Sequence, residues 1–213
     1  MPDNGDYCYP EARLLVFARQ PVPGRVKTRL GARIGTGEAA EVYRQLAATV
    51  LRLVIDARLA PVQVHVTPDP RHPFFTRLAQ RDMLSLHAQV DGDLGVRMCT
   101  SMDAALGCGG PVVLIGTDCP ALDAVYLDRA FQALRAGRQV VLGPAEDGGY
   151  VLIGLRGSQP ELFTGIDWGS ERVLSQTREC IARLGLHCTE LPTLWDVDRV
   201  EDLQRWRSAT AHP

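Results

Sequence analysis

The sequence has 213 residues, 46% of them hydrophobic, so it can bury one substantial core, and we expect a single domain over residues 1–213. A formal net charge of −2 and a pI near 6.2 exclude an overall field that would attract nucleic acid or an anionic membrane. No apolar run is long enough to span a membrane, and the stretch MPDNGDYCYPEA is acidic and polar where a signal peptide would be basic and then apolar, so we expect a cytoplasmic protein.

Short runs of branched aliphatic residues alternate with longer segments whose apolar positions recur every three or four residues. This alternation predicts an α/β protein with a mostly parallel sheet. We expect strands at 12–18, 61–67, 84–89, 111–117 and 139–144, and helices at about 37–58, 70–81, 93–106 and 123–136. Thr36 is expected to cap the first of these helices and Asp123 the last.

The rhythm changes after residue 145. The strand at 150–155 follows the fifth strand after only a tight Gly-Gly turn, so a crossover helix does not fit and we expect a local antiparallel or bent excursion. A helix at about 169–184, a short strand near 187–191 and a helix at 199–208 complete the pattern.

The loop after the first strand, FARQPVPGRVKTRLG, concentrates positive charge. Arg19, Arg25, Lys27 and Arg29 supply cations, and Gly24 allows a close approach to a ligand. Ligands of open α/β sheets bind at the carboxyl ends of the strands, so a phosphate is the natural partner of this loop. It is not a Walker A loop, and an exposed basic turn would explain the same residues.

Asp118, in LIGTDCPAL, comes directly after the most apolar predicted strand. A carboxylate there, opposite a basic phosphate loop, suggests Mg²⁺ or Mn²⁺ bridging the protein and a diphosphate. The alternative is that Asp118 or Thr117 only caps the following turn. Near the other end of the chain, Asp196 and Asp198 lie two residues apart, which suits either a metal site or a cap for the last helix.

Two further loops have less specific patterns. GPAEDGGYVLIGL carries Asp147 beside Gly148 and Gly149, which fits a ligand loop or a plain hairpin. In GIDWGSERVL, Ser170 is a candidate helix cap, and Trp168 offers either a stacking surface or a core side chain.

In this order, FARQPVPGRVKTRL, GDLGVRM, IGTDCPAL, GPAEDGGYVLIGL, WGSERVL and DVDRVEDL resemble one family over nearly the whole chain. These are the small transferases with the glycosyltransferase-A (nucleotide-diphospho-sugar transferase, Rossmann-like) fold, described as radical-SAM or selenodomain-associated transferases. The architecture is more distantly similar to that of the 2-phospholactate and molybdenum-cofactor guanylyltransferases. The resemblance implies a three-layer α/β/α fold around a twisted, mostly parallel sheet.

The resemblance also implies roles by position. The phosphate-holding loop would comprise Pro23, Gly24, Arg25, Lys27 and Arg29, with Asp118 binding the metal and Asp198 completing that site. Two departures stand out: the usual D-x-D is absent, because Gly116 and Pro120 lie two residues from Asp118, and the terminal motif reads DVDRVEDL rather than D-V-D-T-P-E-D.

The segment QVDGDLGVRM is predicted to border the nucleotide or acceptor pocket. We assign Asp93 and Gly95 to the nucleotide, together with Arg19 and the phosphate-holding loop. The acceptor side comprises Asp147, Gly148, Gly149 and Trp168.

These assignments predict a metal-dependent transferase with Lys27 and Asp118 as catalytic residues. Glycosyl transfer from a nucleotide sugar to a small-molecule acceptor is favoured. Nucleotidyl transfer to a phosphorylated small molecule is the alternative, and a non-catalytic nucleotide-binding module is the third interpretation. Base, sugar and acceptor stay open, because one fold supports many activities.

Overall fold

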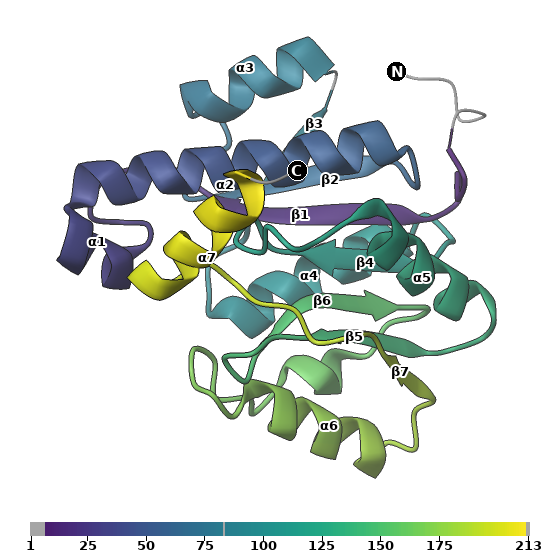
Figure 1. Cartoon of the computed structure of the whole chain (residues 1–213). Helices are drawn as coiled ribbons and strands as arrows, with labels where there is room; N and C mark the ends of the chain where they lie inside the picture. The colour runs from purple at the N-terminus through teal and green to yellow at the C-terminus, as the bar shows by residue number, and fades with distance from the viewer. Residues whose placement is uncertain (1–6, 83, 212–213) are drawn as a thin grey trace.

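A computed structural model describes residues 7–82 and 84–211. Its centre is a seven-stranded sheet in the order β3-β2-β1-β4-β6-β5-β7 (Figure 1). The strands are β1 (Arg13–Arg19), β2 (Val62–Thr67), β3 (Ser85–Ala88), β4 (Val112–Ile115), β5 (Val140–Pro144), β6 (Tyr150–Leu155) and β7 (Cys188–Glu190). The helices are α1 (Thr28–Ile34), α2 (Thr36–Ala57), α3 (Pro73–Asp82), α4 (Leu94–Leu106), α5 (Ala124–Arg135), α6 (Val173–Arg183) and α7 (Val200–Ala211), with the 3₁₀ helix η2 (Pro160–Phe163).

Strand β6 alone runs against the direction of the other strands. Strand β1 pairs with β2 and β4, β2 with β3, and β5 with β7, whereas β6 is antiparallel to both β4 and β5. The short turn between β5 and β6 leaves no room for a crossover helix, so β6 returns alongside β5. The expected antiparallel excursion is therefore confirmed.

Helices cover both faces of the sheet (Figure 1). Residues of α2, α3 and α5 share one apolar cluster with the sheet, and residues of α4, η2 and α6 share another on the opposite face. Strand β1 shows why the central strands are apolar throughout: Leu14 and Val16 belong to the first cluster, and Leu15 belongs to the second. The three-layer α/β/α fold is as predicted. Within the part of the chain described above, no helix is both long and apolar enough to cross a membrane.

The predicted helix caps were only partly right. Asp123 caps α5, because its side chain accepts a hydrogen bond from Tyr126 N at 2.6 Å. Thr36 is not the cap of α2: it is the first helical residue, and Gly35 stands at the cap position without a side chain to contribute. Helix α1 ends directly before Gly35, which has a positive φ of 90° that glycine adopts without strain. The two helices are thus separated by one glycine.

Two elements were missed, and two helices, α3 and α6, begin three and four residues later than expected. Helix α1 lies in the basic segment that was interpreted as loop, and η2 was not foreseen. Helix α6 begins at Val173, so Ser170 is not its cap; the Ser170 hydroxyl instead accepts a hydrogen bond from Arg172 N within the preceding loop.

Candidate active site

The loop after β1 turns Lys27 into the protein. Lys27 has a left-handed backbone conformation (φ 46°, ψ 48°) directly before α1, and its carbonyl accepts the hydrogen bond from Gly31 N at 2.7 Å. The flanking Val26 and Leu30 are buried in apolar clusters that include residues of α2. A left-handed conformation is uncommon for a residue with a side chain and persists where the surrounding packing enforces it. The Lys27 side chain is only 3% exposed as a result.

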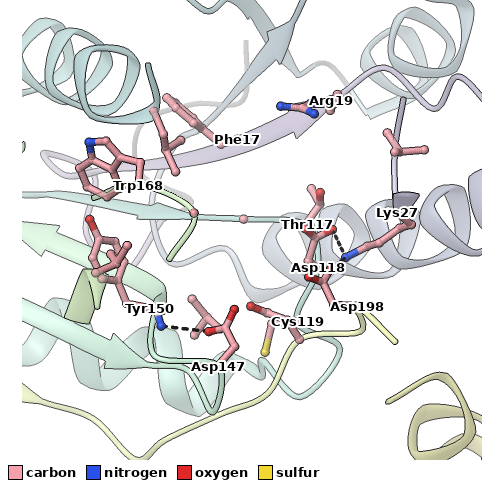
Figure 2. A pocket seen from close by; sticks show the side chains of 18 of the residues that line it. Phe17, Arg19, Lys27, Thr117, Asp118, Cys119, Asp147, Tyr150, Trp168 and Asp198 are labelled. Atoms are coloured by element: carbon pink, nitrogen blue, oxygen red, sulfur yellow. Dashed lines mark hydrogen bonds and ion pairs between the residues drawn. The ribbon is translucent and has the colours of Figure 1, made fainter. Parts of the chain in front are cut away.

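The Lys27 ammonium lies between two carboxylates (Figure 2). Its Nζ lies 3.1 Å from Asp118 Oδ1 and donates a hydrogen bond to Asp198 Oδ1 at 3.0 Å. Burial favours the neutral amine, but the two carboxylates outweigh it and raise the pKa of Lys27 above its ordinary value. The Asp118 and Asp198 side chains are 43% and 42% exposed, so each carboxylate retains access to solvent. Arg29 Nη1 approaches Asp198 Oδ2 at 3.4 Å.

Lys27 is the only lysine in the sequence; all the other basic residues, among 23 lysines and arginines, are arginines. An ammonium is a compact charge with three donors, whereas a guanidinium is a planar fork that suits one carboxylate at a time. The compact group fits between oxygens from two distant segments. A single lysine in an arginine-rich chain is therefore a sequence signal for this bridging position.

The two carboxylates meet because the backbone of the segment before α7 is hydrogen-bonded to the loop that follows β4. Val197 N donates to Asp118 O at 3.0 Å, and the fully buried Val197 side chain packs with residues of α1, α2 and α7. Asp202 Oδ2 accepts hydrogen bonds from the backbone N of Asp198 at 3.0 Å and of Arg199 at 2.7 Å. Asp202 thus accepts the backbone hydrogen bonds at the start of α7, so the Asp198 carboxylate is not needed as a helix cap and can pair with Lys27.

Asp196 lines the same cavity. Burial, followed by the negative charges of Asp118, Asp147 and Asp198 and opposed by Lys27, raises the pKa of Asp196 to about 7. Asp118, Asp147, Asp196 and Asp198 therefore line one cavity, and Lys27 contacts two of them, Asp118 and Asp198.

The loop between β5 and β6 forms another wall of the cavity. Asp147 Oδ1 accepts a hydrogen bond from Gly149 N at 2.9 Å (Figure 2). Gly148 has a φ of +86°, and a Cβ built on it would lie 2.2 Å from Glu171 O. The Gly148 carbonyl also accepts a hydrogen bond from Leu174 N at 2.8 Å, in the first turn of α6. Glycine is needed at 148 because the segment that carries Trp168 and Glu171 passes directly over it.

Trp168 both packs and lines the cavity. Its ring meets that of Tyr150 edge to face, with centroids 6.4 Å apart (Figure 2). A Cβ on Gly95 would lie 2.5 Å from Trp168 Nε1 and 2.5 Å from Phe163 O, so Gly95 is the residue that lets this indole contact α4. The two predicted roles of Trp168 are thus compatible.

The cavity has a volume of about 1460 Å³, more than one small ligand requires. Most of the predicted site residues line it: Arg19, Arg25, Lys27, Arg29, Asp118, Asp147, Gly148, Gly149, Trp168 and Asp198. Pro23, Gly24, Asp93 and Gly95 are not among the lining residues. Asp93 instead caps α4 by accepting a hydrogen bond from Val96 N at 2.9 Å, so a nucleotide-binding role for Asp93 and Gly95 stays a prediction without support from their placement.

The segment QVDGDLGVRM does border the cavity, as predicted, but through residues that the sequence analysis did not single out. Gln89, Leu94, Arg97 and Met98 line it. The sequence does hold a signal for Arg97. It lies four residues after Asp93 in the helix expected at 93–106, and residues four apart on a helix share one face.

Residues 50–170 match the family described as "Uncharacterized protein conserved in bacteria (DUF2064)". The crystal structure of a "putative nucleotide-diphospho-sugar transferase" from Desulfovibrio desulfuricans G20 is 35% identical, with a TM-score of 0.86 over 95% of this chain and 88% of that one. No curated protein matches the sequence significantly.

Two more distant structures share the fold. A cytidylyltransferase from Leptospira borgpetersenii serovar Hardjo-bovis is 15% identical with a TM-score of 0.65, covering 95% of this chain and 87% of that one. Glucosyl-3-phosphoglycerate synthase from Mycobacterium tuberculosis is 14% identical with a TM-score of 0.54, covering 93% and 76%. The fold of nucleotide-diphospho-sugar transferases is thus established for this chain, and the sequence match shows that it belongs to the DUF2064 family.

Proposed function

We propose that this protein is a metal-dependent transferase that moves a sugar from a nucleotide sugar to a small-molecule acceptor. The observation that carries the proposal is the buried Lys27 ammonium between Asp118 and Asp198, in a cavity large enough for two substrates. Support also comes from the relative at 35% identity, which is described as a putative nucleotide-diphospho-sugar transferase. The more distant glucosyl-3-phosphoglycerate synthase was crystallised with Mn²⁺, uridine diphosphate and its product.

The basic loop would hold the donor. The Lys27 ammonium is fixed by its two carboxylates, and the Arg25 and Arg29 side chains are exposed where the loop borders the cavity. In glycosyl transfer an acceptor oxygen bonds to the anomeric carbon, the bond from that carbon to the β-phosphate oxygen breaks, and the nucleoside diphosphate leaves with an extra negative charge. A fixed cation at that oxygen stabilises the developing charge without rearrangement.

The two carboxylates also fit a divalent cation. Hard cations such as Mg²⁺ and Mn²⁺ prefer oxygen ligands, and Asp118 and Asp198 each expose part of a carboxylate to solvent. Among residues 7–82 and 84–211 no group of three or more potential protein ligands surrounds such an ion, so phosphate oxygens and water would complete its shell. When bound, the ion would supply charge neutralisation at the diphosphate.

Nucleotidyl transfer is the second candidate. The observation that favours it is the absence of a second aspartate two residues from Asp118, a departure from the glycosyltransferase pattern. In that reaction an acceptor phosphate bonds to the α-phosphorus of a nucleoside triphosphate, and pyrophosphate leaves. The same lysine and carboxylates would then act on the triphosphate. A nucleotide-binding module without catalysis is the third interpretation.

Product analysis tests the proposal. The protein is incubated with Mg²⁺ or Mn²⁺ and a panel of nucleotide sugars or nucleoside triphosphates, each with mixed acceptors. Release of nucleoside diphosphate from a nucleotide sugar, lost in Asp118→Asn, supports glycosyl transfer. Release of pyrophosphate would select nucleotidyl transfer instead. Nucleotide binding without either product would leave the binding module.

A further inference from the structure

Two arginines from distant parts of the chain line the cavity on the side of α4. Arg19 is the last residue of β1, and Arg97 lies near the start of α4. Burial and the positive charge of Arg19, opposed by Asp93, lower the pKa of Arg97. Within residues 7–82 and 84–211, the ion pairs of the cavity involve Lys27 and other arginines, and neither Arg19 nor Arg97 takes part in one. Two cations that form no ion pair among the described residues thus line one cavity, and only the Asp93 carboxylate partly opposes the charge of Arg97.

The Arg97 guanidinium is held in place from behind. Its Nε donates to Asp93 O at 3.2 Å, and its Nη1 donates to Gln89 Oε1 at 3.0 Å. The Gln89 amide is itself fixed, because its Nε2 donates to Ala18 O at 3.3 Å and to His65 O at 2.8 Å. Arg97 Nη2 has no hydrogen-bond partner among the described residues, so donors are left for a ligand. A preorganised guanidinium loses little entropy when it binds an anion.

Arg97 lies on a different side of the cavity from Lys27, whereas Arg19 Nη1 also reaches the loop of Lys27, where it donates to Arg25 O at 3.5 Å. Residues of α1 and α7, whose segments supply Lys27 and Asp198, pack together with α2, and α4 packs on the opposite face of the sheet (Figure 1). The Trp168 indole contacts α4 at Gly95, two residues from Arg97. The arginine pair therefore adjoins the aromatic wall that was assigned to the acceptor.

Several other lining residues near this position are apolar. Phe17, Leu94 and Met98 pack in the same cluster as Tyr150 and Trp168, and all five line the cavity. A ligand bound there would contact an aromatic and aliphatic surface next to two guanidinium groups. Guanidinium groups bind carboxylates and phosphates through paired hydrogen bonds.

We propose that Arg97 and Arg19, the second of which was expected from the sequence to hold the nucleotide, form an anion site for the acceptor, which is therefore a small molecule with a carboxylate or phosphate group rather than a neutral sugar. The proposal rests on the proposed function for the presence of a separate acceptor. The same anion chemistry could come from the phosphates of the nucleotide, and the experiment separates these two sources.

The experiment uses the full chain and nuclear magnetic resonance of arginine Nε–H groups. Inorganic phosphate and acetate are titrated with and without saturating Mg²⁺ and uridine or guanosine diphosphate. We expect phosphate or acetate to shift the Arg97 signal with the nucleotide already bound, and Arg97→Gln to weaken this binding by about tenfold or more. Arg97→Lys, which keeps the charge but loses the fork, should weaken it less. Arg178→Gln removes an arginine paired with Glu190 on the surface and is the matched control.

Three results would overturn the proposal. The first is equal anion affinity in the parent protein and Arg97→Gln. The second is competition between the anion and the nucleoside diphosphate together with a comparable loss of nucleotide affinity in Arg97→Gln, which would assign the arginines to the nucleotide. The third is an anion effect of equal size in Arg178→Gln. If no nucleotide binds the parent protein, the proposed function fails, and the titration without nucleotide still decides whether Arg97 binds an anion.

Discussion

Replacing Lys27 by methionine should change metal and nucleotide affinity in opposite directions. Methionine has an unbranched side chain like the buried stem of the lysine but carries no charge. In the parent protein the ammonium lies 3.1 and 3.0 Å from the Asp118 and Asp198 carboxylates, so it neutralises the charge that a free cation would seek. Lys27→Met should therefore bind Mn²⁺ more tightly when no nucleotide is present. Nucleotide affinity should fall by at least about tenfold, or 1.4 kcal/mol, because the cation beside the diphosphate is lost.

The effect on stability should be modest. A hydrogen bond to a charged group contributes about 1.5–3 kcal/mol, but both carboxylates are more than a third exposed and regain water when the ammonium is removed. We expect the free energy of unfolding in urea to fall by about 1–3 kcal/mol. Calorimetric titrations with Mn²⁺ alone and with Mn²⁺ plus nucleotide measure the two affinities.

Lys27→Arg is the matched control for charge. It keeps a cation in the loop but cannot place one compact group between two carboxylates, so its metal affinity should stay near that of the parent while its nucleotide affinity falls. Weaker or unchanged Mn²⁺ binding in Lys27→Met would show that the lysine and the metal do not share these carboxylates.

Asp118→Asn should reduce metal-dependent nucleotide affinity by about tenfold or more, with little change in the urea midpoint of unfolding. Asp198→Asn should have the same effect in milder form. Unchanged nucleotide affinity in calorimetric titrations would contradict this prediction. Gly95→Ala should destabilise by about 1–3 kcal/mol and shift the tryptophan emission, because the new methyl meets an indole and a carbonyl, whereas Gly37→Ala, with open space around it, should not. Burial, followed by the neighbouring His87, lowers the pKa of His65 from 6.5 to about 4. The folded state therefore binds this proton less readily than the unfolded state, so the free energy of unfolding is highest above pH 6.5 and falls by roughly 3 kcal/mol between pH 6.5 and 4. Urea titrations across this range should show the fall, and His65→Gln should flatten it.

The order of strands and helices could be predicted because it depends on local patterns. All seven strands lie within two residues of their predicted positions, since apolar runs between turn residues reflect burial on both faces of the sheet. Helix α1 could not be predicted, because its segment is basic and carries Gly31, and it is stabilised by packing against α2 and α7. The later start of α6 has a similar origin, since its first turn is completed by the carbonyl of Gly148 from another loop.

The sequence by itself placed cations and carboxylates at strand ends, and parallel strands bring those ends to one edge. It did not determine which groups meet. The Lys27 ammonium reaches Asp118 and Asp198 because a left-handed backbone turns it inward and because Val197 is attached to the end of β4. Arg97 faces the cavity because Gln89 holds it there. The contacts of Lys27 join residues far apart in the chain, and Gln89 is itself fixed by the distant carbonyls of Ala18 and His65, so only the packed tertiary structure decided these positions.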